Sequence, residues 1–316
     1  MLMLLQPKHP MKNYHILNGD GIFEAWKHQN YEGEPIIFRE MLVEGESMTE
    51  LWTHRFFEKR KHFFLTNYGV TFEEYNNLSG VELQKMNQLI NASSITLWFE
   101  NDLFCYINLM ATLHYLYQIN NSEIEIWLVM GEGTKGLGEY SKEAFGQLYH
   151  QKIKLDKDDL YFASKFWEFY TNADLDNFVT YIKRSPKFLP LLNEVMSTYL
   201  EQFPQKESGV NKLERRVLKF LNDEPLTENK LIGKLLRRQK YEGFGDMQYE
   251  KILKLMSINL IEKAENNLLV LSSEGRNVLR GLQKFDDEQW PYQFYGGAMR
   301  TEYYYDQEKS FLIERN

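Results

Sequence analysis

Two stretches determine the architecture that we expect: Tyr14-His15-Ile16-Leu17-Asn18-Gly19-Asp20-Gly21 and Ile95-Thr96-Leu97-Trp98-Phe99-Glu100-Asn101-Asp102. Each passes from an apolar run into acidic residues at the point where a buried strand would end. Helices are expected next, over residues 21–28 and 102–117. Open α/β sheets bind their ligands just beyond the carboxyl ends of the strands. We therefore expect Asp20, Glu100 and Asp102 to face one crevice.

The pattern of strands and helices predicts four segments. Strands alternating with helices over residues 11–150 indicate an α/β domain with a mostly parallel, Rossmann-like sheet in three layers. Residues 151–207 carry no strand signal and are expected to be helical. Residues 208–284 show three short helices followed by two short strands, an order typical of a winged helix. Residues 285–316 form an aromatic C-terminal extension.

The composition is that of a globular protein with an uneven charge. The net charge is −8 overall, but residues 210–284 hold 15 Lys and Arg against 10 Asp and Glu, a local net charge of +5. The remaining residues carry a net charge of −13. An acidic body with a mildly basic module raises the expectation of contact with nucleic acid through residues 210–284. A helix that is basic only for solubility gives the same pattern.

The single cysteine, Cys105, excludes an internal disulfide and a cysteine-based zinc site. It follows Phe104 in an apolar stretch, so we expect a buried, inert thiol. A reducing, cytoplasmic location fits this cysteine usage. No apolar stretch reaches the length of a membrane span, so no membrane association is expected.

Several motifs resemble a bacterial family. They are His15-x-x-Asn18-Gly19-Asp20, Arg39-Glu40 with Glu44-Gly45, Trp98-Phe99-Glu100-x-Asp102-Leu103-Phe104-Cys105, Gly136-Leu137-Gly138, Glu214-Arg215-Arg216 and Gly243-x-Gly245-Asp246-Met247-Gln248. Together they are similar to the domain-of-unknown-function family eighteen thirty-five. The resemblance spans most of residues 14–260 and implies an N-terminal α/β domain followed by a helical region. It implies no established activity and no catalytic residue.

The acidic cluster has two interpretations. Carboxylates at strand ends bind hard cations such as Mg²⁺ or Mn²⁺ and often share them with a phosphate, which makes Asp20, Glu100 and Asp102 candidate metal ligands. Alternatively, Asp20 and Asp102 each cap a helix, and Glu100 pairs with Arg39. The two interpretations are compatible, since a capping carboxylate retains further lone pairs.

Glycine-rich turns beside the cluster indicate a small ligand. Gly19 and Gly21, with Glu40 further on, echo a dinucleotide fingerprint, but Glu24 stands at the third glycine position and disfavours an NAD site. The run from Gly131 to Gly138 offers backbone N–H groups to an anion or forms a plain flexible connection. His15 is either a core residue or a partner of the carboxylates. The predicted ligand-binding residues are His15, Asn18, Asp20, Arg39, Glu40, Glu100, Asp102, Gly136 and Gly138.

The third helix of the basic module is expected at the position that reads DNA in helix-turn-helix proteins. Lys251 and Lys254 would meet phosphates there, and Gln248 would reach a base edge. The alternative is that the module packs internally or contacts a protein, which the acidic residues Glu242 and Glu250 favour.

The sequence thus predicts an α/β protein that binds a small phosphate-bearing ligand or nucleotide, fused to a module that contacts nucleic acid or a partner protein. A metal-dependent phosphoesterase or nucleotidyl-transfer enzyme using Asp20, Glu100 and Asp102 is the alternative, and a purely structural interaction protein is a third possibility. Ligand identity, catalysis and oligomeric state stay open at this stage.

Overall fold

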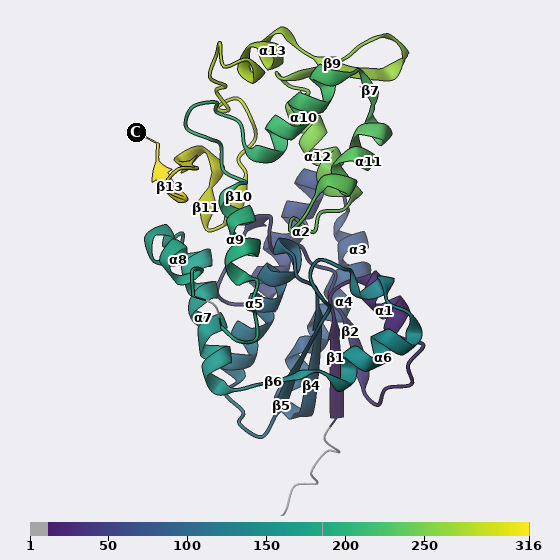
Figure 1. Ribbon diagram of the computed structural model, residues 1–316. Helices are drawn as coiled ribbons and strands as arrows, with labels where there is room; N and C mark the ends of the chain where they lie inside the picture. Colours follow the sequence, from purple (N-terminus) through teal and green to yellow (C-terminus); the bar gives the residue numbers. More distant parts are fainter. Residues whose placement is uncertain (1–11, 185, 316) are drawn as a thin grey trace, which may run out of the picture.

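A five-stranded sheet organises the first half of the chain (Figure 1). The computed structural model describes residues 12–184 and 186–315, so the predicted domain start at residue 11 lies outside the described residues. The strand order is β2-β1-β4-β5-β6, and all neighbours are parallel except β5 and β6. The strands are β1 (Lys12–Leu17), β2 (Glu34–Ile37), β4 (Ala92–Phe99), β5 (Glu125–Met130) and β6 (Ile153–Leu155). The predicted α/β class with a mostly parallel sheet is confirmed.

Helices cover both faces of this sheet, and alternate residues of each strand point to opposite faces. Leu17, Trp98 and Val129 pack with α1 (Asp20–Trp26) and α6 (Lys142–His150) on one face. Their neighbours Ile16 and Leu97 belong to the larger core on the other face, which includes α5 (Leu103–Ile119) and, packed on it, α7 (Lys157–Thr171).

Two expectations about local structure are wrong. The region after residue 150 does contain a strand, because β6 pairs antiparallel with β5 at the edge of the sheet. Its three residues, Ile153-Lys154-Leu155, are too few to show an alternating pattern, and Lys154 pairs with Glu125 across the strands. Asp20 does not cap α1, because Gly19 is the N-cap and no side chain caps this helix.

A long connection between β2 and β4 crosses the top of the sheet in the view of Figure 1. It contains the short strand β3 (Gly45–Glu46) and four turns or helices before η2 (Lys85–Asn91). These are α2 (His54–Tyr68), α3 (Phe72–Tyr75), the π-turn η1 (Asn76–Gly80) and α4 (Val81–Gln84). After β5, the turn η3 (Leu137–Glu139) precedes α6.

The second half begins with α7, α8 (Leu175–Tyr181) and α9 (Leu192–Leu200). Three helices and a small antiparallel sheet of order β7-β9-β8 follow. These elements are α10 (Lys212–Asp223), β7 (Leu226–Thr227), α11 (Glu228–Arg238), α12 (Asp246–Met256), β8 (Ile261–Lys263), η4 (Glu265–Asn267), β9 (Leu268–Leu271) and α13 (Ser273–Leu279).

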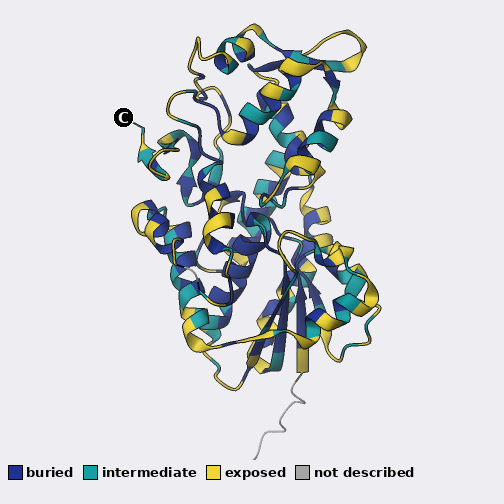
Figure 2. Ribbon diagram, viewed as in Figure 1, coloured by how far each residue is buried: buried dark blue, intermediate teal, exposed yellow. Residues whose placement is uncertain are grey.

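The C-terminal segment returns to the first half of the chain. Strand β10 (Phe294–Gly296) runs parallel to β3 and antiparallel to β11 (Ala298–Met299). After η5 (Arg300–Glu302), β12 (Tyr303–Asp306) and β13 (Phe311–Glu314) form a hairpin. Buried residues from all four predicted segments form one hydrophobic cluster, which continues from the sheet into the upper helices (Figure 2). Within the described residues, no helix combines the length and apolar character that a membrane crossing requires.

A buried charge cluster fixes the C-terminal segment. The guanidinium of Arg300, 1% exposed, donates to both carboxylate oxygens of Glu214 in α10 at 2.7 and 3.0 Å. It also donates to Asp287 at 2.8 Å, and Arg315 pairs with the same carboxylate. The paired arginines hold the pKa of Asp287 below its usual value despite its burial. The cluster joins three parts of the chain that are far apart in sequence.

Replacing Arg300 with Met is expected to lower the free energy of unfolding by about 3–5 kcal/mol, because Glu214 keeps no cationic partner inside the protein. Lys309→Met is the matched control, since Lys309 is exposed and its pair with Asp306 is worth well under about 1 kcal/mol. Urea unfolding of both variants measures the difference. Equal effects would show that the Arg300 cluster adds nothing to stability.

Candidate functional site

The two acidic stretches leave the same edge of the sheet. Strands β1 and β4 are parallel neighbours, and Leu17 lies opposite Trp98 in their register. From β1 the chain continues to β2 on one side, whereas β4 lies on the other side, so the order reverses between them. This is the switch point at which open α/β sheets place their ligands. Asp20, Glu100 and Asp102 therefore follow strands that end at the same edge of the sheet, whereas their facing one crevice stays a prediction.

The side chain of Asp20 nevertheless turns away from the other two carboxylates. Its oxygens accept hydrogen bonds from Nε and Nη2 of Arg39 at 2.7–3.0 Å, and it is 64% exposed. Arg39 also donates to the carbonyl of Leu78. Arg39 therefore pairs with Asp20, and the expected pairing of Glu100 with Arg39 is wrong.

Cys105, rather than Asp20, is the third side chain close to Glu100 and Asp102. The side chains that come together are Glu100, Asp102 and Cys105, whose ligand atoms lie within 4.8 Å of one another. Asp102 caps α5, with Oδ1 accepting from the backbone N–H of Cys105 at 2.7 Å. Asn18 donates to Sγ of Cys105 at 3.0 Å. Residues from both strand ends thus converge.

Burial shifts the proton equilibria of this group upward. Desolvation, reinforced by the neighbouring Asp102, raises the pKa of Glu100 to about 7. Burial also raises the pKa of Asp102 and that of the Cys105 thiol. Two carboxyl groups with raised pKa values whose oxygens lie within 4.8 Å favour sharing a proton or binding a cation. Perturbed pKa values of this kind concentrate at functional sites.

The turn between α11 and α12 covers Asp102. The backbone N–H groups of Leu103 and Phe104 donate to the carbonyls of Tyr241 and Glu242 at 2.7 and 3.3 Å. Gly243 has a φ of +69°, and a Cβ there would lie 2.3 Å from Oδ1 of Asp102. Only glycine fits this contact. Gly243 belongs to a motif of the family resemblance, but nothing in the sequence indicates that it reaches the strand ends.

The glycine-rich run after β5 binds a carboxyl group of the protein itself, that of Glu100. The backbone N–H of Leu137 donates to Oε1 of Glu100 at 2.5 Å, and the N–H of Gly136 donates to Glu139. Gly136 lies against the Glu100 carboxylate, and Gly138 lies against the backbone of Gly21 in α1. The N–H groups of Gly136 and Leu137 are therefore already occupied by carboxylates of the chain.

His15 is a satisfied core residue. It is 1% exposed, its Nδ1 accepts from the indole N–H of Trp98, and its Nε2 lies 3.1 Å from the carbonyl of Glu32. Burial lowers its pKa to about 4, so it stays neutral at physiological pH. These contacts use both ring nitrogens, and the expected contact of His15 with the carboxylates is absent from the described structure.

Asn18 and Glu40 have structural partners. Asn18 accepts from Nδ2 of Asn108, which also donates to the carbonyl of Glu40. The Glu40 carboxylate is 1% exposed and receives hydrogen bonds from Arg60 and from the Tyr75 hydroxyl at 2.6 Å. Glu40 is therefore an internal ion pair, whereas Asn18 also contacts Cys105 and borders the cluster.

Helix α12 carries the three residues that were predicted to contact nucleic acid. Two of them contact the N-terminal domain instead of solvent. Gln248 is 5% exposed and lies against Met41, while its Oε1 caps the start of α12. Lys251 pairs with the buried Glu44 at 2.8 Å and lies over the rings of Phe63 and Tyr68. Lys254 alone is exposed. Gln248 and Lys251 thus have partners inside the protein. Their expected contact with a duplex stays a prediction.

No protein-family model matches the chain, and no curated protein matches it either. The resemblance to the domain-of-unknown-function family eighteen thirty-five is therefore untested by comparison. The functional interpretation rests on the geometry of the site.

The pKa of Glu100 makes a pH prediction. Because it rises from 4.5 to about 7 on folding, the native state binds more protons than the unfolded state between these values. The free energy of unfolding is expected to fall as pH rises from about 4.5 through 7, by roughly 3 kcal/mol at most. Glu100→Gln, measured by urea unfolding with a chelator present, should remove most of this decline. An unchanged pH profile in the variant would contradict the shift.

A second pair of variants tests the orientation of α12. Lys251→Met is expected to cost about 2 kcal/mol of stability, because it removes the cation beside the buried Glu44 carboxylate. Lys254→Met, one helical turn away and exposed, should stay within about 0.5 kcal/mol of the parent. Urea unfolding again provides the measurement. The reverse ranking would place Lys251 in solvent.

Proposed function

We propose that this protein binds a divalent cation, Mg²⁺ or Mn²⁺, at Glu100 and Asp102, and through the cation the phosphate groups of a small molecule or nucleotide. The observation that supports the proposal is the convergence of these two carboxylates at the switch point between β1 and β4. Protein sites for Mg²⁺ usually supply one or two carboxylates and leave the remaining positions to water and substrate phosphate. The two carboxylates of Glu100 and Asp102 match this pattern of magnesium coordination.

Electrostatics favour a cation over a bare phosphate as the first ligand. Glu100 and Asp102 repel a phosphate, and they already accept the N–H groups of Leu137 and Cys105. A bound cation would change this repulsion into attraction, because it lowers the pKa of both carboxyl groups and attracts the phosphate. The Cys105 thiol, protonated because of its burial, is a poor ligand for a hard cation and serves as packing.

The elements from α10 to β9 support a winged-helix-like module whose role is to close this site. Its α11–α12 turn places Gly243 on Asp102, and its helix α12 packs on α2. A ligand larger than a cation requires that turn to move. The strand order β2-β1-β4-β5 likewise supports the Rossmann-like assignment of the first domain.

Glu100 also favours a second candidate function, the metal-dependent phosphoesterase or nucleotidyl transferase. A carboxyl group with a pKa of about 7 exchanges protons readily at neutral pH, as a general acid or base must. Asp20, bound to Arg39, then lies outside the catalytic set. Hydrolysis of a phosphoester only in the presence of metal, and its loss in Glu100→Gln, would distinguish the enzyme from a binding protein.

Cation binding by the purified protein tests the proposal. Isothermal titration with MgCl₂ and MnCl₂ should show saturable binding that tightens between pH 6 and 8, because Glu100 has to release its proton. Asp102→Asn should weaken binding at least about tenfold, the loss expected for one charged ligand (about 1.4 kcal/mol). Adding a nucleoside triphosphate should raise the thermal midpoint further only when the metal is present.

Two control variants sharpen this experiment. Glu132→Gln removes an exposed carboxylate from the loop that follows β5 and should leave metal affinity unchanged. Asp20→Asn should also leave it unchanged, because Asp20 is bound to Arg39. A loss in Asp20→Asn equal to that in Asp102→Asn would restore the trio expected from the sequence, and no binding at millimolar metal would refute the proposal.

A further inference from the structure

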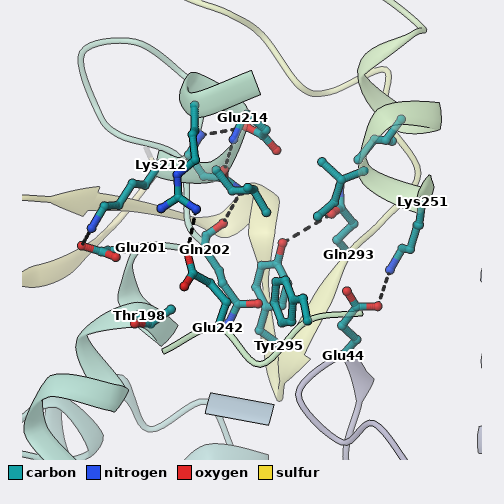
Figure 3. A pocket seen from close by; sticks show the side chains of 16 residues that line it. Glu44, Thr198, Glu201, Gln202, Lys212, Glu214, Glu242, Lys251, Gln293 and Tyr295 are labelled. Carbon is teal, nitrogen blue, oxygen red and sulfur yellow. Dashed lines mark hydrogen bonds and ion pairs between the residues drawn. The ribbon is translucent and has the colours of Figure 1, made fainter. Parts of the chain in front are cut away.

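A cavity lies where four parts of the chain meet (Figure 3). Its walls come from the end of α9, the start of α10, the α11–α12 turn with α12, and the residues before and in β10, together with Glu44. Its volume is about 40 Å³, whereas about 10–15 Å³ is enough to hold one water molecule. It is separate from Glu100 and Asp102, which do not line it.

The charges in its walls cancel. Glu44 pairs with Lys251, Glu201 with Lys212, and Glu242 with Arg216, at 2.6–2.9 Å. Glu214, the fourth carboxylate, is held by Arg300. Each acidic group has its own cation, so the walls neither need nor exclude a charged guest through net charge.

Two side-chain amide donors in the walls, in contrast, have no acceptor among the described residues. Gln202 is 8% exposed, and among the described residues nothing accepts from its Nε2. Nε2 of Gln293, on another wall of the cavity, is also buried without an acceptor. An unpaired buried amide donor costs about 1–3 kcal/mol, so two of them facing one cavity call for an explanation.

The neighbouring wall adds a cationic donor. The guanidinium of Arg216 bonds Glu242 through Nη1 alone among the contacts of the described residues, and a guanidinium has five N–H donors. The carboxylate beside it is fully used, because Oε1 of Glu242 is bonded to Arg216 and Oε2 to backbone N–H groups. A guest that matches this wall brings oxygen acceptors and no donors.

We propose that this junction cavity binds one small oxyanion group, a carboxylate or a phosphoryl oxygen group, between the side-chain amides of Gln202 and Gln293 with Arg216 beside it. The volume of the cavity suits a group of that size. Because the walls belong to the body, to the module and to the C-terminal segment, the bound anion joins the three.

Anion-dependent thermal unfolding of the full chain tests this site. The protein is titrated with sodium acetate, sodium phosphate or sodium chloride at matched ionic strength. Acetate or phosphate should raise the thermal midpoint saturably, by about 2 °C at roughly ten times the dissociation constant, whereas chloride should not. The first two titrations distinguish a carboxylate from a phosphoryl group.

Variants locate the effect. Gln202→Leu and Gln293→Leu each remove one unpaired donor, so each should weaken the anion response at least about tenfold. Gln151→Leu, an exposed glutamine at the other end of the molecule, is the control and should respond like the parent. Equal midpoints in all three salts, or an unchanged response in both cavity variants, would overturn the proposal.

Discussion

The start of helix α5 imposes the constraint on which the arrangement of the two halves depends. Its first backbone N–H groups need acceptors, and a helix start inside a protein cannot leave them unpaired. Asp102 satisfies the N–H of Cys105, while the carbonyls of Tyr241 and Glu242 satisfy those of Leu103 and Phe104. The C-terminal module is therefore held by backbone hydrogen bonds at the same sheet edge where the carboxylates converge.

Buried charges extend this connection beyond the helix start. Glu40, at the end of β2, is paired with Arg60 of α2, and Glu44 further along is paired with Lys251 of α12. Arg60 also donates to the backbone carbonyl of Glu44, so this hydrogen bond links the two pairs. Buried pairs add little net stability over apolar packing, but a missing partner is costly. We infer that they fix the position of α12 on α2 rather than strengthen the fold.

The sequence predicts strand ends well and side-chain partners poorly. The passage from apolar to acidic residues located the ends of β1 and β4, and the expected three helices and two strands occur within residues 208–284. By contrast, the sequence did not predict that Arg39 pairs with Asp20 rather than with Glu100, or that Cys105 lies beside the two carboxylates. Such partners depend on the positions of segments that are distant in the sequence. The Gln and Lys pattern of α12 suits a DNA groove or a protein surface equally well, since both reward exposed polar side chains. Only the position of Glu44 and Met41 separates the two.

Glu242 connects the strand-end site with the junction cavity. Its carbonyl accepts the N–H of Phe104 beside Asp102, while its carboxylate pairs with Arg216 in the cavity wall. The turn that carries it therefore contributes to both sites and cannot move without changing each. A ligand shifts such an equilibrium only by its difference in affinity between the two positions of the turn. The anion proposed for the junction cavity would bind Arg216 and Gln202 in their present positions, so it would favour the turn that covers Asp102. A nucleotide-sized ligand at Glu100, as proposed, would favour a turn that has moved away from Asp102. The two ligands are then expected to oppose each other, and by linkage each weakens the other by the same factor.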